Sequence, residues 1–146
     1  MRLLVALSLV ASLLTGCSGE GDDYCGVLRD ERTALAELAQ KAQANDADYL
    51  TAALAIFQGL RKAAPEDLRD EWDTLIFAWS DLVDALKEAG IAPRDFDPKK
   101  RPADVSPTEF SHVRDLAAEL SSTRVLDAAD GIDDHAEQEC NVDLSL

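Results

Sequence analysis

The chain has 146 residues, of which 29 are Asp or Glu and 14 are Lys or Arg, giving a formal net charge of −15 at pH 7. This excess of negative charge repels nucleic acids and anionic headgroups, so it excludes nucleic-acid binding and favours cations or basic surfaces as partners. Apolar residues make up 47% of the chain, and they alternate with charged residues at regular spacing. That pattern favours one folded helical domain over a disordered acidic tail.

The N-terminal segment carries the clearest pattern. Arg2 precedes an apolar run over residues 3–14, which ends in Leu14-Thr15-Gly16-Cys17. This order resembles the signal peptide of a bacterial lipoprotein, whose lipobox ends at the cysteine that receives the lipid. The resemblance implies that residues 1–16 are removed on export. It also implies that Cys17, acylated with a fatty acid such as palmitate, anchors the protein at the outer face of the cell membrane.

Two other interpretations of this segment remain open. A membrane-spanning helix needs about 20 apolar residues, more than the run contains, and the run ends in small residues rather than in a basic stop. Ordinary signal-peptidase cleavage would leave the chain without lipid, but no Ala-x-Ala site follows the run. The residues therefore favour lipoprotein processing.

The chain has three cysteines, Cys17, Cys25 and Cys140. An odd number in an exported protein leaves one thiol unpaired. If Cys17 carries lipid, as the resemblance implies, a pair remains, and Cys25–Cys140 is the one disulfide compatible with that role. An oxidising compartment would preserve it. The absence of a Cys-x-x-Cys motif makes a structural bond the expectation, rather than a redox or metal site.

The lipid-bearing tether is expected over residues 17–23 and the helical bundle domain over 24–146. Because residues 18–23 are small, polar or acidic, the tether is expected to be flexible and extended. Beyond it, apolar residues recur at steps of three and four, which predicts helices over 24–44 and 47–63.

Pro65 and Gly90 mark the ends of a third predicted helix, over residues 65–89. Proline suits a first helical turn because the N–H that it lacks would be unpaired there, and glycine suits a left-handed C-cap. Residues 91–105 contain three prolines and the basic run Lys99-Lys100-Arg101, so a long surface connection is expected. The basic run is either a solvated loop or a docking spot for an anionic partner.

The last arm begins at Ser106-Pro107-Thr108-Glu109, a capping box that predicts a helix over 107–120. Apolar spacing resumes after Ser121-Ser122-Thr123 and predicts a further helix, nearly in line with it, over 123–140. The sequence leaves open whether residues 121–123 kink or break this arm.

Short, short and long connections between four arms predict an all-α, up-down-up-down four-helix bundle with a kinked or broken last arm. In such a bundle the first arm begins where the fourth ends. Cys25 and Cys140 would then meet at the end that carries the tether, and the basic loop would lie at the opposite end.

No residue pattern in the chain points to catalysis. His112 and His135, the two histidines, lack zinc-ligand spacing, and neither a Gly-x-Ser-x-Gly turn nor a glycine-rich phosphate loop is present. Glu139 lies one turn after His135, with Asp130, Asp133 and Asp134 nearby, which gives either a weak surface cation site or, more simply, a solvated helix face. We therefore predict no catalytic residue, no metal and no cofactor.

Trp72 and Trp79 are seven residues apart and so share one helix face. Together with Phe57 they are candidate ligand-facing residues between helices, and core packing is the alternative explanation.

The leading hypothesis is a non-enzymatic, surface-anchored lipoprotein that binds or spaces another component of the cell envelope. In its richness in alanine, aspartate and arginine and its framing cysteines, the chain resembles uncharacterised small helical lipoproteins of high-GC Gram-positive bacteria. That resemblance implies no specific role. The second hypothesis is a bundle that binds a small apolar ligand in a pocket lined by Trp72, Trp79 and Phe57.

Overall fold

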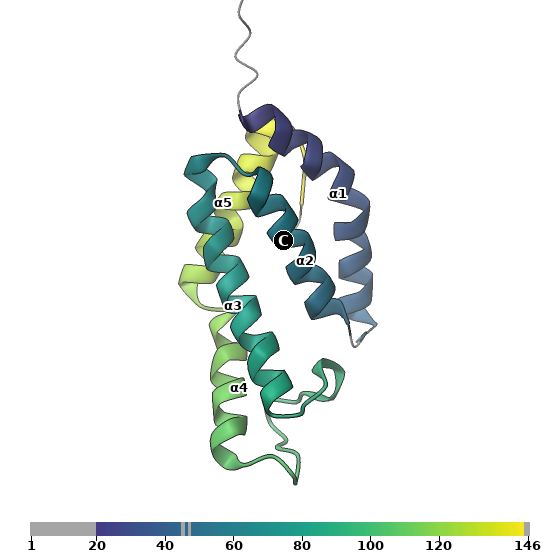
Figure 1. Cartoon of the computed structure of the whole chain (residues 1–146), viewed down its shortest axis with the longest axis vertical. Helices are drawn as coiled ribbons and strands as arrows, with labels where there is room; N and C mark the ends of the chain where they lie inside the picture. The colour runs from purple at the N-terminus through teal and green to yellow at the C-terminus, as the bar shows by residue number, and fades with distance from the viewer. Residues whose placement is uncertain (1–19, 45, 47, 145–146) are drawn as a thin grey trace, which may run out of the picture.

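The computed structural model describes residues 20–44, 46 and 48–144, which form helices and turns and no strand (Figure 1). The predicted all-α class is confirmed. Residues 1–16 and Cys17 lie outside the described part of the chain. In chain order the elements are α1 (Glu20–Gln43), α2 (Tyr49–Ala63), the 3-10 turn η1 (Glu66–Leu68), α3 (Arg69–Glu88), the 3-10 turn η2 (Pro93–Asp95), α4 (Pro107–Glu119) and α5 (Thr123–Cys140).

The helices form the four arms of the predicted bundle, with α4 and α5 together making the fourth (Figure 1). α1 packs beside α2, and α2 beside α3. α5 runs along one half of α3 and α4 along the other half. α1 and α5 meet much less extensively than the other neighbours do. The bundle is therefore least closed between its first and last helices.

α1 begins four residues earlier than the sequence analysis predicted. Residues 20–23, expected in an extended tether, are helical. Three of these four residues are acidic, and negative charge in a first turn is stabilised by the positive end of the helix dipole. The expectation of a flexible, extended segment was therefore wrong for residues 20–23.

Serine caps define the fourth arm. Ser106 Oγ accepts a hydrogen bond from the Glu109 N–H at 3.2 Å, and the Glu109 carboxylate accepts one from the Ser106 N–H at 3.1 Å. These bonds lower the pKa of the Glu109 carboxyl and confirm the predicted capping box. Ser122 Oγ likewise accepts from the Val125 N–H at 3.3 Å, which starts a new helix. The last arm is thus broken between α4 and α5.

Gly90 ends α3 in the predicted left-handed conformation, with φ of +67°. Its N–H donates to the Lys87 carbonyl at 3.1 Å, and the Ile91 N–H donates to the Leu86 carbonyl at 2.9 Å. This pair of bonds is a Schellman motif, which satisfies carbonyls that a helix end would otherwise leave unpaired.

The predicted disulfide is present. Cys25 in α1 and Cys140 at the end of α5 are bonded, with their Cα atoms 5.1 Å apart and a sequence separation of 115. The connection over residues 91–105, with its basic run, lies at the opposite end of the molecule (Figure 1). Both ends of the bundle therefore have the arrangement that the topology predicted.

The long connection is more than a surface loop. Ile91 and Val105 are buried, and the Phe96 ring lies 6.2 Å from that of Phe110 in α4. These side chains belong to a second core cluster, separate from the main core beside the disulfide. It lies where α3 ends and α4 begins. The basic run itself, residues 99–101, is exposed as expected.

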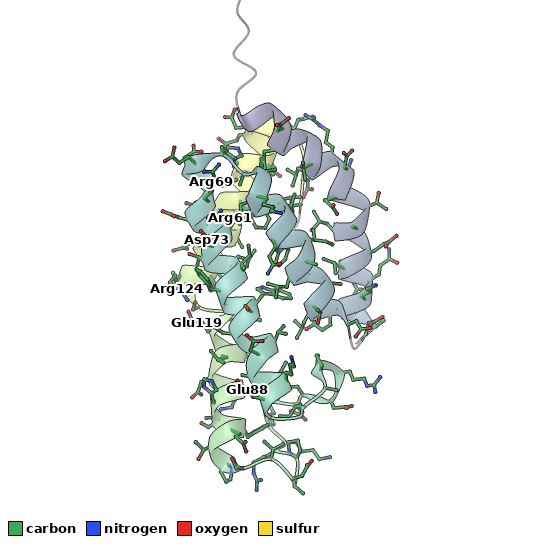
Figure 2. All side chains as sticks on the ribbon, viewed as in Figure 1. Arg61, Arg69, Asp73, Glu88, Glu119 and Arg124 are labelled. Carbon is green, nitrogen blue, oxygen red and sulfur yellow. A yellow bond between two sulfur atoms is a disulfide. The ribbon has the colours of Figure 1, made fainter. Side chains whose placement is uncertain are left out.

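An ion pair holds α2 against α3. Arg61 donates to both carboxylate oxygens of Asp73, at 2.9 and 2.8 Å (Figure 2). These hydrogen bonds lower the pKa of the Asp73 carboxyl. The fork geometry fixes the rotation of the two helices relative to one another.

Candidate ligand groove

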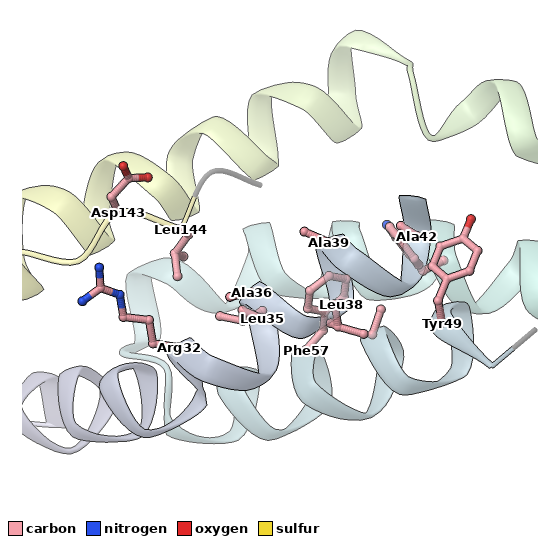
Figure 3. A pocket seen from close by; sticks show the side chains of 12 residues that line it. Arg32, Leu35, Ala36, Leu38, Ala39, Ala42, Tyr49, Phe57, Asp143 and Leu144 are labelled. Atoms are coloured by element: carbon pink, nitrogen blue, oxygen red, sulfur yellow. The ribbon is translucent and has the colours of Figure 1, made fainter. Parts of the chain in front are cut away.

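An open groove of about 520 Å³ lies under α1 (Figure 3). Its volume falls within the roughly 300–1,000 Å³ typical of small-molecule sites. α1 and α2 supply most of its lining, α3 contributes Trp79, and the segment after α5 closes one end. The lining residues are Arg32, Leu35, Ala36, Leu38, Ala39, Ala42, Tyr49, Ala53, Phe57, Trp79, Asp143 and Leu144.

The sequence of α1 explains why the helix leaves space here. Near its start, in the second and third turns, Tyr24 and Leu28 are fully buried in the core. Further along, the lining positions include Ala36, Ala39 and Ala42, whose methyl groups cannot reach across to a neighbouring helix. The bundle is consequently well packed beside the disulfide and open farther along α1.

Three aromatic rings form a stiff wall of the groove. The Trp79 ring meets Phe57 edge-on at 5.4 Å and an angle of 90°, and it meets Tyr49 at 6.4 Å and 87°. Edge-to-face packing of this kind stabilises aromatic pairs beyond their buried area. Burial raises the pKa of the Tyr49 phenol.

The charged groups of the groove lie at one end, away from Tyr49 (Figure 3). Arg32 forms no ion pair with the described part of the chain. The Asp143 carboxylate is directed away from Arg32 (Figure 3) and lies within 4.8 Å of carboxylate oxygens of Asp133 and Glu137. The guanidinium of Arg32 is therefore left facing solvent at the mouth of an apolar groove.

The structure separates the three candidate ligand-facing residues. Phe57 and Trp79 line the groove. Trp72 does not: it is fully buried, and its indole N–H donates to the Tyr24 hydroxyl at 3.2 Å. Sequence reasoning placed Trp72 beside Trp79 because the two share a helix face, but only Trp79 lies where α1 leaves space.

Sequence reasoning also missed the contributions of α1 and of the chain end. The signal in α1 is the spacing of Ala36, Ala39 and Ala42, which puts small side chains along one stripe. Leu144 joins the lining because the chain reverses after α5. The local signal for that reversal is Asn141, because asparagine adopts the left-handed C-cap conformation more readily than most residues.

The histidines occupy two different settings. His112 is exposed and borders a surface hollow lined also by Asp81, Asp84 and Glu88. His135 is half-buried, with its ring 5.8 Å from that of Tyr24.

Asp133, Glu137 and Asp143 bring carboxylate oxygens within 4.8 Å of one another. This cluster includes neither His135 nor Glu139, which the sequence analysis had considered. Exposed acidic groups at this separation are common in so acidic a protein, and we assign no ion to them.

The fold and the groove define a disulfide-linked, all-helical bundle with an open apolar groove under its first helix. No known protein family, curated protein or solved structure matches the chain. Among the described residues, no helix has both the length and the apolar character needed to span a bilayer.

Proposed function

We propose that this protein is a non-enzymatic lipoprotein, anchored at the outer face of the cell membrane, that binds a small apolar ligand in the groove under α1. The groove is the observation that carries the proposal. Its volume of about 520 Å³ and largely aliphatic and aromatic lining are those of a small-molecule site. Binding would bury apolar surface that the free bundle leaves exposed to water, which is the driving force.

The groove has little of what catalysis needs. Its titratable side chains are Arg32, Asp143 and Tyr49. Asp143 lies at the mouth and is exposed, and burial moves the pKa of the Tyr49 phenol further above neutral pH. General acid–base catalysis requires a group whose pKa lies near the working pH beside the reacting atoms. This composition supports a binding role.

The proposed anchor rests on the lipobox-like residues that end at Cys17, and it fits the geometry of the bundle. α1 begins at Glu20, so at most three residue steps, or about 10 Å, separate its first residue from Cys17. The disulfide joins the helices at that same end. An acylated Cys17 would therefore hold the disulfide end of the bundle close to the membrane.

A fluorescent apolar probe tests the binding function. N-phenyl-1-naphthylamine is neutral and brightens when it leaves water, and we expect it to bind the purified protein at a single site. Ala39→Trp places a large ring in the groove and should abolish binding. Ala55→Trp is the matched control because Ala55 is exposed on α2 and lies outside the lining. Absence of probe binding, or equal binding by both variants, would refute the proposal.

A further inference from the structure

The end of the chain shows what shape of group fits between α1 and α5. After α5, Asn141 adopts a left-handed conformation with φ of 55°, and the chain turns back toward α1. Val142 is buried, and Leu144 packs against the main core and borders the groove. A slim, extended segment with apolar groups therefore already occupies the first part of this gap, and the groove continues beyond it.

The dimensions of the groove suit one extended chain lying along α1. Arg32 and Ala42 mark its extent along α1, which is about 15 Å at a rise of about 1.5 Å per residue. Dividing the volume of about 520 Å³ by this length gives a mean cross-section of about 35 Å². An extended alkyl chain of about 12 carbons matches the length, because each C–C bond of about 1.5 Å advances it by about 1.25 Å.

The polarity of the lining distinguishes an acyl chain from an extended peptide. A peptide would bring an N–H and a C=O at every residue, and each needs a partner once it leaves water. The backbone N–H of Leu144 has such a partner, because it donates to the Asp133 carboxylate at 3.1 Å. Beyond Leu144 the lining is alanine, leucine and aromatic side chains as far as Tyr49. An alkyl chain needs no such partners.

Arg32 makes one end of the groove positively charged, so the two ends differ chemically. It stands at the end where Leu144 enters, its guanidinium has no carboxylate partner among the described residues, and the Asp143 carboxylate is directed away from it. The net charge of −15 opposes anions at long range, but a carboxylate at this mouth would gain a charge-assisted hydrogen bond at contact while remaining partly hydrated.

We infer that the groove takes one unbranched fatty acid, with its carboxylate beside Arg32 and its alkyl chain running along α1 toward Tyr49. This inference rests on the proposed function and names the ligand class for the same groove. It requires that the protein prefer a fatty acid to the alcohol of equal chain length.

Competition against N-phenyl-1-naphthylamine tests the inference. The protein is the processed chain, residues 17–146, with Cys17→Ser, which lacks both the apolar run over residues 3–14 and the proposed lipid and so needs no detergent. We expect dodecanoate to displace the probe about fivefold more effectively than dodecan-1-ol, since an exposed charge pair contributes up to about that factor. Arg32→Gln should remove this preference by weakening displacement by dodecanoate down to the level of dodecan-1-ol. Arg114→Gln, an exposed cation on α4, is the control and should keep the preference.

The other possible results separate the fatty-acid inference from the proposed binding function. Equal displacement by acid and alcohol, or a preference that survives Arg32→Gln, would refute the fatty-acid inference while leaving apolar binding intact. A peptide copying residues 141–146 that displaces the probe better than dodecanoate would identify a peptide groove instead. If the probe itself does not bind, the proposed function fails and this inference fails with it.

Discussion

The indole N–H of Trp72 in α3 donates a 3.2 Å hydrogen bond to the phenol oxygen of Tyr24 in α1, across 48 residues of sequence. Both side chains are fully buried. The bond lies next to the covalent link, because Tyr24 precedes Cys25. Phe57 packs against the same indole with ring centroids 5.7 Å apart. The disulfide end of the bundle is therefore held by a buried polar contact as well as by the S–S bond.

Tyr24→Phe should destabilise the protein by about 1–3 kcal/mol, because it leaves the buried Trp72 N–H without its partner. The midpoint of urea unfolding measures the loss. Tyr49→Phe is the control: the Tyr49 hydroxyl makes no hydrogen bond within the described part of the chain, so its removal should cost much less. Equal losses from the two variants would contradict a specific role for the Trp72–Tyr24 bond.

Tyr24 should also make stability fall at high pH. Burial raises its pKa from 10.0 to about 12, against a smaller lowering by the hydrogen bond from Trp72. A phenol whose pKa is higher in the folded state contributes stability that is fully present below pH 10.0 and is lost as the pH rises toward about 12. Tyr24→Phe should therefore lose less stability over this interval than the unaltered protein. Urea unfolding measured at about pH 9 and about pH 11 gives the difference. Parallel losses in the two proteins would count against the assignment.

The three cysteines should separate anchoring from stability. Replacing both Cys25 and Cys140 by Ser opens a loop of 115 residues and should cost roughly 4–5 kcal/mol in the chain-entropy account. This variant should still sediment with membranes and incorporate an alkynyl palmitate label. Cys17→Ser should do the reverse, with loss of the label and an unchanged unfolding midpoint. Similar effects of both replacements would contradict this division of roles.

Two glycines should respond oppositely to alanine. Gly59 lies inside α2 with nothing within 4 Å of an added Cβ, so Gly59→Ala should stabilise the protein by about 0.5–1 kcal/mol. Gly90 has the same free space but a φ of +67°, and Gly90→Ala should cost about 1–2 kcal/mol. Thermal unfolding of the two variants measures both effects. A stabilising Gly90→Ala would show that the left-handed C-cap is not required.

Much of the helical architecture could be predicted because its causes are local. The capping box at Ser106 and Glu109 starts α4, and Gly90 ends α3, since each satisfies backbone groups within a few residues of itself. The bundle topology then follows from the lengths of the connections. The meeting of Cys25 with Cys140 agrees with it.

Packing between distant segments could not be predicted in the same way. The connection over 91–105 looked like a solvated loop because of its prolines and charges, yet Ile91 and Val105 enter the second core cluster. The burial of these two residues depends on neighbours that short-range spacing does not specify. Residues 20–23 also looked like a tether but extend α1, for which the acidic first turn gives a local reason.

The sequence by itself determined where helices begin and end to within a few residues, because hydrogen bonding and apolar periodicity act over one or two turns. It also placed Trp72 and Trp79 on one face of α3. Only the tertiary structure decided that Trp72 is sealed beneath Tyr24 while Trp79 faces an open groove. The physical reason is that α1 packs closely on the core near its start and presents alanines farther along. Whether a residue on this face of α3 is covered therefore depends on which part of α1 lies over it.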